Sequence, residues 1–207
     1  MQTELTLLYE AERQRLAGPL DCAQDGDRRH PVFGVGPEQP ALMLIGEAPG
    51  REEAAAGLPF VGKAGKQLNE LLTKACIDRG TVYVTNAVKY RPTWASARGC
   101  ANRTPLPEEI RAGLPLLECE IRILKPTWIA TLGNTPLWAV LQLAGAERES
   151  IGSLHGTPRR VEICGRRIWL YPLYHPASAI YNKSLLPLME KDLQGLGLWI
   201  NGKENER

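Results

Sequence analysis

The feature that most limits how this 207-residue chain can fold is a regular alternation of short apolar segments with stretches of helical periodicity. Four segments rich in Val, Ile, Leu and aromatic residues have the length of buried strands: 42–45, 82–88, 128–132 and 168–173. Between them, apolar residues recur at helical spacing in residues 65–75, 107–124 and 135–143. Because strands that alternate with helices form parallel sheets covered on both faces, the pattern predicts an α/β fold with a mostly parallel sheet.

Two more helices are predicted outside this unit, an amphipathic one at residues 3–16 and a closing one at residues 185–199. With 43% hydrophobic residues, a chain of this length can build one core of ordinary size. We therefore expect a single domain over residues 1–200, followed by a polar C-terminal tail at 201–207.

Two connecting regions are also informative. A hairpin with Gly165-Arg166 at its turn is expected to join residues 160–164 to residues 167–171. Residues 91–107, "RPTWASARGCANRTPLP", show no periodicity and are rich in Pro, Arg and small residues. They predict a long surface loop, which is uncommon unless function requires it.

Charge and cysteine content limit the classes of function. The formal net charge of +2 is too small for a generally polycationic protein, so nucleic-acid binding would need a local basic patch. No stretch approaches the roughly 20 apolar residues of a membrane span, and the N-terminus lacks a secretory pattern, so we expect no membrane association and a cytoplasmic location. Five cysteines without a C-x-x-C pair indicate free thiols rather than disulfides or a zinc site.

Polar or Gly/Pro-rich sequence follows every predicted strand. "GEAPG" follows the first strand, Asn86 ends the second, "LGNTP" follows the third and "YHPAS" follows the fourth. Each could by itself be a turn, a strand-end cap or a core histidine. Because ligands of parallel sheets bind beyond the carboxyl ends of the strands, the four together predict a ligand site at that edge.

Several familiar chemistries do not match these motifs. The Gly46-to-Gly50 loop lacks the Lys-Ser/Thr end of a phosphate-binding loop and the spacing of a dinucleotide-binding one. There is no G-x-S-x-G motif, only three histidines are present, and no clustered metal ligands are seen. A pocket with an aromatic ring, an amide and an imidazole remains.

These three groups suit a planar heterocycle. Phe60 can stack on its face, the Asn86 amide can donate and accept along its edge, and His175 can hydrogen-bond a ring oxygen. Enzymes that act on a base in DNA extrude the base from the duplex and read its edge in such a pocket. The residues therefore predict nucleobase chemistry.

Five motifs in order carry a family resemblance: "GEAPGREE…GLPFVGKAG", "VYVTNAVKYRP", "NRTPLPEEI", "KPTWIATLG" and "YHPAS". From about residue 41 to residue 178, the chain resembles the uracil-DNA glycosylase superfamily, in particular its family-four branch. This resemblance implies a three-layer α/β/α sandwich around a four-stranded, mostly parallel sheet. It also implies a monofunctional glycosylase that hydrolyses the bond between uracil and deoxyribose in DNA and leaves an abasic site.

The resemblance assigns roles to the first motif. It places Glu47, Ala48 and Pro49 beside the deoxyribose and the uracil, with Glu47 and Ala48 in the catalytic group and Pro49 and Gly50 among the substrate-binding residues. In the best-known branch an aspartate at the place of Ala48 positions the attacking water. The small residue here, as in family four, has no carboxylate that could activate water at this place.

The remaining pocket residues are assigned in the same way. Glu53 matches an acid near the C5 edge of uracil, where a bulky group would exclude the thymine methyl. Phe60 matches the stacking aromatic residue, and Asn86 matches the amide that reads N3 and O4. His175 matches the imidazole that hydrogen-bonds O2 and stabilises the departing uracil anion.

For DNA contacts, the resemblance implies that residues 176–181 press into the minor groove, with Ser178 among them and Ile180 or Tyr181 as the wedge. A local basic cluster is also expected to grip DNA, with a solvated surface face as the alternative. Its members are Lys89, Arg91, Arg98 and Arg103.

One departure from family four is large, because its members hold a 4Fe–4S cluster on four cysteines. Here Cys22 stands at the first place, but Asp25, Tyr90 and Gly113 stand at the others, and Cys119 is displaced by almost two helical turns. One thiolate cannot hold a cluster, so we expect no iron–sulfur cluster and no other metal. The loop at residues 90–105 is then expected to be held by packing of Tyr90 and Trp94.

Two function classes remain open from the sequence. The first is a glycosylase for uracil, or for other deaminated bases such as hypoxanthine and xanthine, with damaged DNA as partner. The second is a non-catalytic DNA or nucleobase binder, suggested by Ala48 and the missing cysteines. A monomer is expected in either case.

Overall fold

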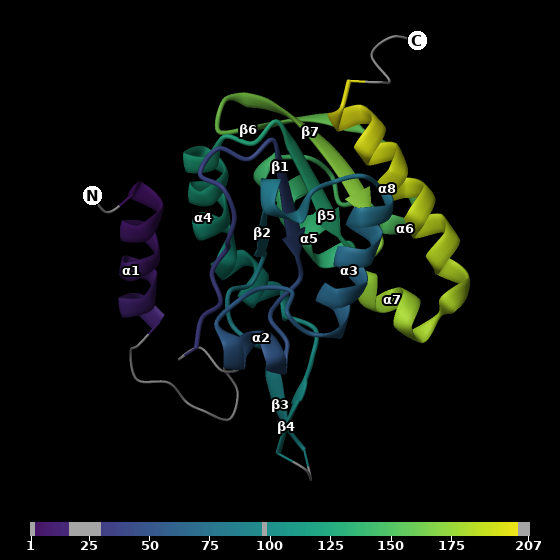
Figure 1. Ribbon diagram of the computed structural model, residues 1–207. Coiled ribbons are helices and arrows are strands. Elements are labelled where there is room, and N and C mark those ends of the chain that lie inside the picture. Colours follow the sequence, from purple (N-terminus) through teal and green to yellow (C-terminus); the bar gives the residue numbers. More distant parts are fainter. Residues whose placement is uncertain (1–2, 17–29, 97–98, 203–207) are drawn as a thin grey trace.

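The four apolar segments form the parallel strands of the central sheet (Figure 1). A computed structural model describes residues 3–16, 30–96 and 99–202, without the side chains of residues 95–99, and in it these strands are β1, β2, β5 and β7. Their bounds are Leu42–Gly46, Val82–Asn86, Trp128–Leu132 and Arg166–Leu173. β1 pairs in parallel with β2 and β5, and β5 pairs in parallel with β7.

The sheet has a fifth strand, so the predicted count of four was one too low. β6 (Arg159–Ile163) runs antiparallel to β7 at the edge of the sheet, in the order β2-β1-β5-β7-β6. The predicted hairpin is confirmed, but its turn is Cys164-Gly165 rather than Gly165-Arg166. Both turn residues have positive φ, 52° and 68°, as a two-residue type I′ turn requires.

Helices cover both faces of the sheet, and the predicted three-layer sandwich is confirmed. Alternate side chains of β1 point to opposite layers: Met43 and Ile45 pack into one hydrophobic cluster, and Leu42 and Leu44 into the other. The first cluster contains residues of α4 (Pro107–Leu124) and α5 (Asn134–Leu143). The second contains residues of α3 (Lys63–Lys74) and α8 (Leu186–Ile200).

Other elements complete the described chain. α1 (Glu4–Leu16) lies beside α4 at the side of the body (Figure 1). The first family motif, "GEAPGREE…GLPFVGKAG", contains the short helix α2 (Arg51–Ala56). The remaining short helices are α6 (Ile151–Leu154), α7 (Pro176–Tyr181), η1 (Arg79–Thr81) and η2 (Lys183–Leu185). No helix in the described part of the chain has the length and apolar character needed to cross a membrane.

The predicted long loop at 91–107 also contains regular structure. β3 (Thr93–Ser96) and β4 (Gly99–Asn102) form an antiparallel hairpin that projects from the body at the carboxyl edge of the sheet (Figure 1). Tyr90 is buried as expected, with 6% of its surface exposed. Trp94 is 57% exposed, so the prediction that it packs to hold this region was wrong.

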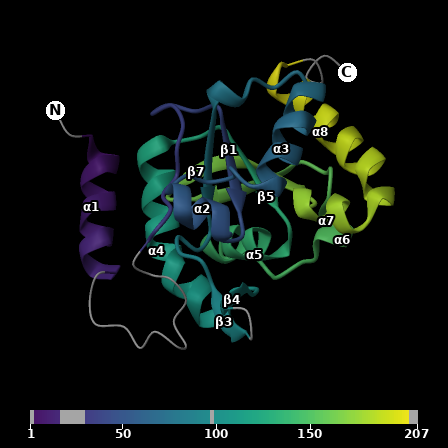
Figure 2. The ribbon, with the colours of Figure 1, turned by 60° about the horizontal axis from the view of Figure 1, so that its bottom comes forward.

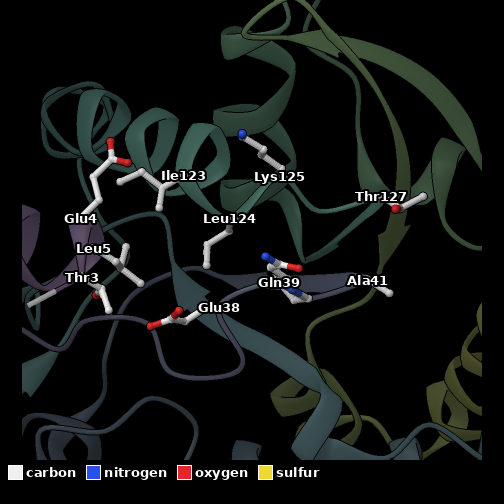
Figure 3. Close-up of a pocket in the computed structure, with 11 residues that line it drawn as sticks. Thr3, Glu4, Leu5, Glu38, Gln39, Ala41, Ile123, Leu124, Lys125 and Thr127 are labelled. Carbon is white, nitrogen blue, oxygen red and sulfur yellow. The ribbon is translucent and has the colours of Figure 1, made fainter. Parts of the chain in front are cut away.

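The strand order places a crevice at the carboxyl ends of the strands. The chain passes from β1 to β2 on one side and then returns to β5 and β7 on the other side of β1. The connections therefore diverge above β1, where ligands of open α/β sheets bind. A cavity of about 690 Å³ lies at the opposite edge, near Ala41 and Thr127, and none of the predicted site residues lines it (Figure 3).

Candidate active site

A cavity of about 430 Å³ lies at the carboxyl ends of β1, β2 and β7 and brings most of the predicted site residues together. The predicted residues that line it are Glu47, Ala48, Gly50, Glu53, Phe60, Asn86, His175, Ile180 and Tyr181. Pro49 is buried and does not line the cavity, and neither does Ser178. Three of the four strand-end motifs, far apart in the sequence, therefore meet at one site, whereas no residue of "LGNTP" lines the cavity.

Phe60 and Asn86 converge over Gly46, the last residue of β1. A Cβ built on Gly46 would lie 2.4 Å from the Asn86 Oδ1 and 2.5 Å from the Phe60 Cζ, so only glycine leaves room for both. Gly65 is required for a similar reason, because its Cβ would lie 1.7 Å from the Phe60 carbonyl oxygen. Phe60 itself has φ of 56°, a conformation that large side chains rarely adopt and that often marks functional sites.

His175 faces Phe60, with ring centroids 6.1 Å apart and the ring planes at 32°. It caps the N-terminus of α7, since its Nδ1 accepts a hydrogen bond of 3.1 Å from the Ala177 amide. Nδ1 must therefore be unprotonated, which places the proton of the neutral ring on Nε2. Burial lowers the pKa of His175 to about 4, and the charge of Glu53 opposes this only in part. The ring is thus a neutral donor through Nε2.

The lowered pKa predicts that His175 stays neutral, with its proton on Nε2, as the pH falls from about 8 to about 5, whereas a free histidine titrates near 6.5. Nitrogen chemical shifts of the imidazole would check this directly. Because the unfolded chain takes up the proton first, this group lowers stability as the pH falls from about 6.5 to about 4. A titration of the His175 ring near pH 6.5 would contradict the assignment.

Glu47 lies on the wall of the same cavity and is held by a residue from another element. Thr135, in the first turn of α5, donates a hydrogen bond of 2.7 Å to the Glu47 Oε2. Burial raises the pKa of Glu47, and the bond from Thr135 partly offsets that rise. The result is an oriented carboxylate whose basicity is above the usual range, which suits a group that accepts a proton from water.

Glu53 also lines the cavity, but its carboxylate is engaged by the backbone. Oε2 accepts a hydrogen bond of 3.1 Å from the Gly50 amide, and Oε1 accepts one of 2.8 Å from the Gly62 amide. Gly50 and Gly62 are the N-caps of α2 and α3. Glu53 therefore holds the two helix starts together at the edge of the cavity, a structural role that its sequence position did not indicate.

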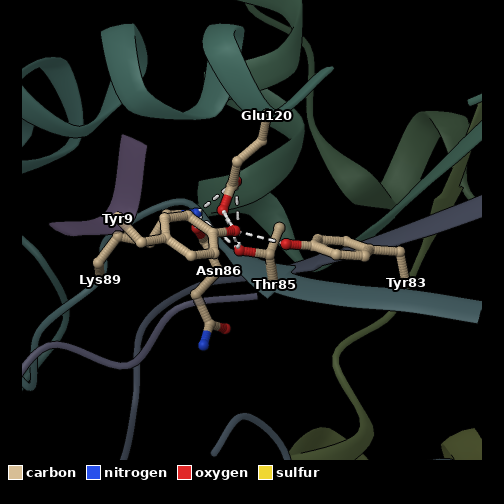
Figure 4. Close-up of polar contacts among 6 residues, drawn as sticks. All are labelled: Tyr9, Tyr83, Thr85, Asn86, Lys89 and Glu120. Carbon is tan, nitrogen blue, oxygen red and sulfur yellow. Dashed lines mark hydrogen bonds and ion pairs between the residues drawn. The ribbon is translucent and has the colours of Figure 1, made fainter. Parts of the chain in front are cut away.

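Lys89 corrects the predicted basic cluster, because its side chain is buried with only 3% exposed and cannot reach DNA. Its Nζ donates to Glu120 Oε2 at 2.7 Å, to Thr85 Oγ1 at 2.7 Å and to the Asn86 carbonyl oxygen at 2.6 Å. Burial lowers the pKa of Lys89, and Glu120 opposes this. Lys89 therefore fixes the backbone of Asn86, whose amide points away from this cluster (Figure 4).

Arg103 is also withdrawn from solvent. Its guanidinium makes two bonds to the Glu109 carboxylate, of 2.5 Å and 2.8 Å, and its side chain is 9% exposed. Arg91 is partly exposed and donates to the Asn102 side chain. Arg98 lies outside the described residues. The two predicted wedge residues do project into solvent, with Ile180 43% and Tyr181 90% exposed.

Sequence reasoning missed four residues of this region. Arg51 and Lys63 are exposed cations that line the cavity, Asn102 reaches it from β4, and Thr135 positions Glu47. Arg51 and Lys63 stand inside the motifs "GREE" and "GKAG", so a count of cations within these motifs would have found them. Asn102 and Thr135 also stand in quoted motifs, "NRTPLPEEI" and "LGNTP", but their roles depend on contacts with distant elements that the motifs do not reveal.

Two of the four places at which family four has cluster cysteines are closely packed in this chain. Tyr90 is buried and donates to Glu109, and Gly113 packs so closely that a Cβ there would lie 2.4 Å from the Ala87 carbonyl oxygen. A cysteine at 113 would need the backbone to move. Cys22 and Asp25 lie outside the described residues. Elsewhere, in the ranges that the structure covers, no three His, Cys, Asp or Glu side chains are grouped to hold a metal.

Sequence comparison with known proteins identifies the family of this chain. The sequence model of the Uracil DNA glycosylase superfamily matches residues 33–196, which is most of the chain. The chain belongs to this superfamily. It is 40% identical to a type-4 uracil-DNA glycosylase of Pyrobaculum aerophilum, over 83% of this chain and 84% of that protein. It is also similar to the type-4 uracil-DNA glycosylases of Saccharolobus solfataricus, with 37% identity over 81% and 74%, and of Thermotoga maritima, with 34% over 86% and 85%.

Proposed function

We propose that this superfamily member is a monofunctional uracil-DNA glycosylase, which hydrolyses the N-glycosidic bond of uracil in DNA and leaves an abasic site. The observation that carries the proposal is the convergence of Phe60, Asn86 and His175 in one cavity. The similarity to type-4 uracil-DNA glycosylases over most of the chain supports it independently.

Three contacts would recognise the extruded base. The Phe60 ring offers a stacking face, and the Asn86 amide, which makes no hydrogen bond among the described residues, is available to N3–H and O4 of uracil. The Nε2–H of His175 would donate to O2. This set reads the Watson–Crick edge of the flipped base, as enzymes acting on extruded bases do.

The same groups can drive the reaction. As the bond between C1′ and N1 breaks, its electron pair moves onto the uracil ring, so negative charge develops at O2, where the neutral His175 donates. A water oxygen bonds to C1′, and the proton lost by that water passes to Glu47, whose carboxylate is oriented by Thr135. Uracil leaves as an anion, and Ala48 leaves room for the water beside the sugar.

The function is tested by incubating the protein with a uracil-containing oligonucleotide and measuring free uracil and alkali-sensitive strand breaks. We expect one break at the uracil and none in the undamaged control. Parallel oligonucleotides with hypoxanthine and xanthine test the wider range of bases. DNA binding without base release on any of these substrates would overturn the proposal in favour of a non-catalytic binder.

We further propose that the enzyme works without an iron–sulfur cluster. The support is the buried Tyr90 and the tightly packed Gly113 at two of the places where family four has cysteines. We therefore expect purified, anaerobically prepared protein to contain no stoichiometric iron and to show no visible cluster absorbance while it releases uracil. Iron at four atoms per chain would contradict this.

A further inference from the structure

The β3–β4 hairpin projects from the body next to the cavity and contributes one residue to the cavity wall. Asn102, the last residue of β4, lines the cavity, and a Cβ on Gly50 would lie 3.6 Å from the Asn102 Nδ2. Figure 2 shows the hairpin and α7 reaching the carboxyl edge of the sheet from two different sides. The hairpin is therefore placed where DNA must pass if the cavity receives a flipped base.

Two arginines brace the base of the hairpin. Arg91 donates to the Asn102 Oδ1 at 2.6 Å and to the Cys100 carbonyl oxygen at 3.2 Å. Arg103 donates to the Thr93 carbonyl oxygen at 3.1 Å while Glu109 holds its guanidinium from α4. Arg91 thus binds the backbone of β4, and Arg103 binds the backbone of β3. These two contacts orient the hairpin relative to the cavity.

This braced hairpin presents a tryptophan to solvent. Trp94 lies across from Ala101 in the β3–β4 register, and 57% of its surface is exposed. Together with Tyr181 of α7, it is one of two strongly exposed aromatic side chains among the described residues, and Tyr181 lines the cavity. An exposed indole on a hairpin that borders a nucleobase pocket has the properties of a base-stacking platform.

We propose that Trp94 stacks on a base of the uracil-containing strand next to the flipped nucleotide. The inference rests on the proposed function, because the flipped uracil defines where the strand runs. Extrusion of uracil breaks the stack on its neighbours, so a flanking base has an open face that an indole can cover. The exposed cations Arg51 and Lys63 at the rim of the cavity complement the phosphates of the same strand.

The test compares Trp94→Ala, Trp94→Phe and the control Leu198→Ala, an exposed apolar residue on α8. For a single-stranded uracil oligonucleotide, we expect Trp94→Ala to raise KM by about ten- to a hundredfold, the range typical of a lost base–aromatic stack, with a much smaller change in kcat. Trp94→Phe should retain most of the affinity, and Leu198→Ala should match the wild type. All three should have wild-type melting temperatures, since neither side chain is buried.

Tryptophan fluorescence gives a second readout that does not need catalysis. Undamaged single-stranded DNA should quench part of the wild-type emission, and that part should be missing in Trp94→Phe. If the wild type releases uracil but Trp94→Ala has an unchanged KM and Trp94→Phe quenches like the wild type, the hairpin proposal is wrong while the function stands. If no variant releases uracil, the proposed function fails, and the quenching alone decides whether Trp94 contacts DNA.

Discussion

Replacing His175 with alanine is expected to lower the rate of uracil release by about a hundred- to a thousandfold, the usual cost of losing one donor to a developing anion. The physical reason is that His175 is a neutral ring with its N–H on Nε2, which in the proposed mechanism donates to O2 of uracil, where negative charge develops. Single-turnover rates at saturating DNA would measure the loss at the chemical step and exclude a change in binding.

His155 provides a matched control for this variant. It pairs with Asp192 at 2.8 Å and does not line the cavity. His155→Ala is expected to keep the rate of the chemical step within about threefold of wild type, because His155 lies outside the cavity that would hold the base. A His175→Ala variant that stayed within tenfold of wild type would refute the role assigned to this donor.

Replacing Lys89 with methionine is expected to lower the free energy of unfolding by about 3–5 kcal/mol, because it leaves the carboxylate of Glu120 buried without its cation. Glu120 is fully buried, and its remaining partners are the hydroxyls of Tyr9 and Thr85. Tyr9 also shares a short hydrogen bond with Tyr83, so the cluster ties α1 to β2 (Figure 4). Urea denaturation at neutral pH would measure the loss.

Two comparisons separate the buried charge from general damage. The double variant Lys89→Met with Glu120→Met removes both charges and is expected to recover a large part of the lost stability. Lys74→Met breaks an ion pair with Glu190 whose lysine side chain is 53% exposed, and should cost less than about 1 kcal/mol. If Lys89→Met were as mild as Lys74→Met, the cluster would not stabilise the fold in the way described.

The bounds of helices and strands could be predicted closely where the spacing of apolar residues in the sequence is enough to define the element. The predicted helix at residues 107–124 matches α4, and the strand at 128–132 matches β5, because both have continuous apolar faces. The missed hairpin within residues 91–107 has no alternating apolar pattern: its strands are short, and its position depends on Arg91 and Arg103. Long-range polar contacts of this kind leave no periodic signal.

The candidate site divides in the same way. Phe60, Asn86 and His175 could be recognised from the sequence because each stands in a motif at or after a strand end, and parallel strands bring such ends together. Lys89 could not be assigned correctly, because a lysine in a motif shared with Arg91 looks like a surface cation. Only the structure shows that Lys89 forms an ion pair with Glu120 in the interior, so that the lysine charge is not available to DNA.

The order of motifs along the chain determined the family, the layer architecture and the residues that enter the cavity. Tertiary structure decided which charged groups face solvent, which tautomer His175 adopts, and that an exposed tryptophan stands on a braced hairpin that borders the pocket. The physical reason is that apolar periodicity is local and survives in the sequence, whereas the partner of a charge or a lone pair comes from a segment far along the chain.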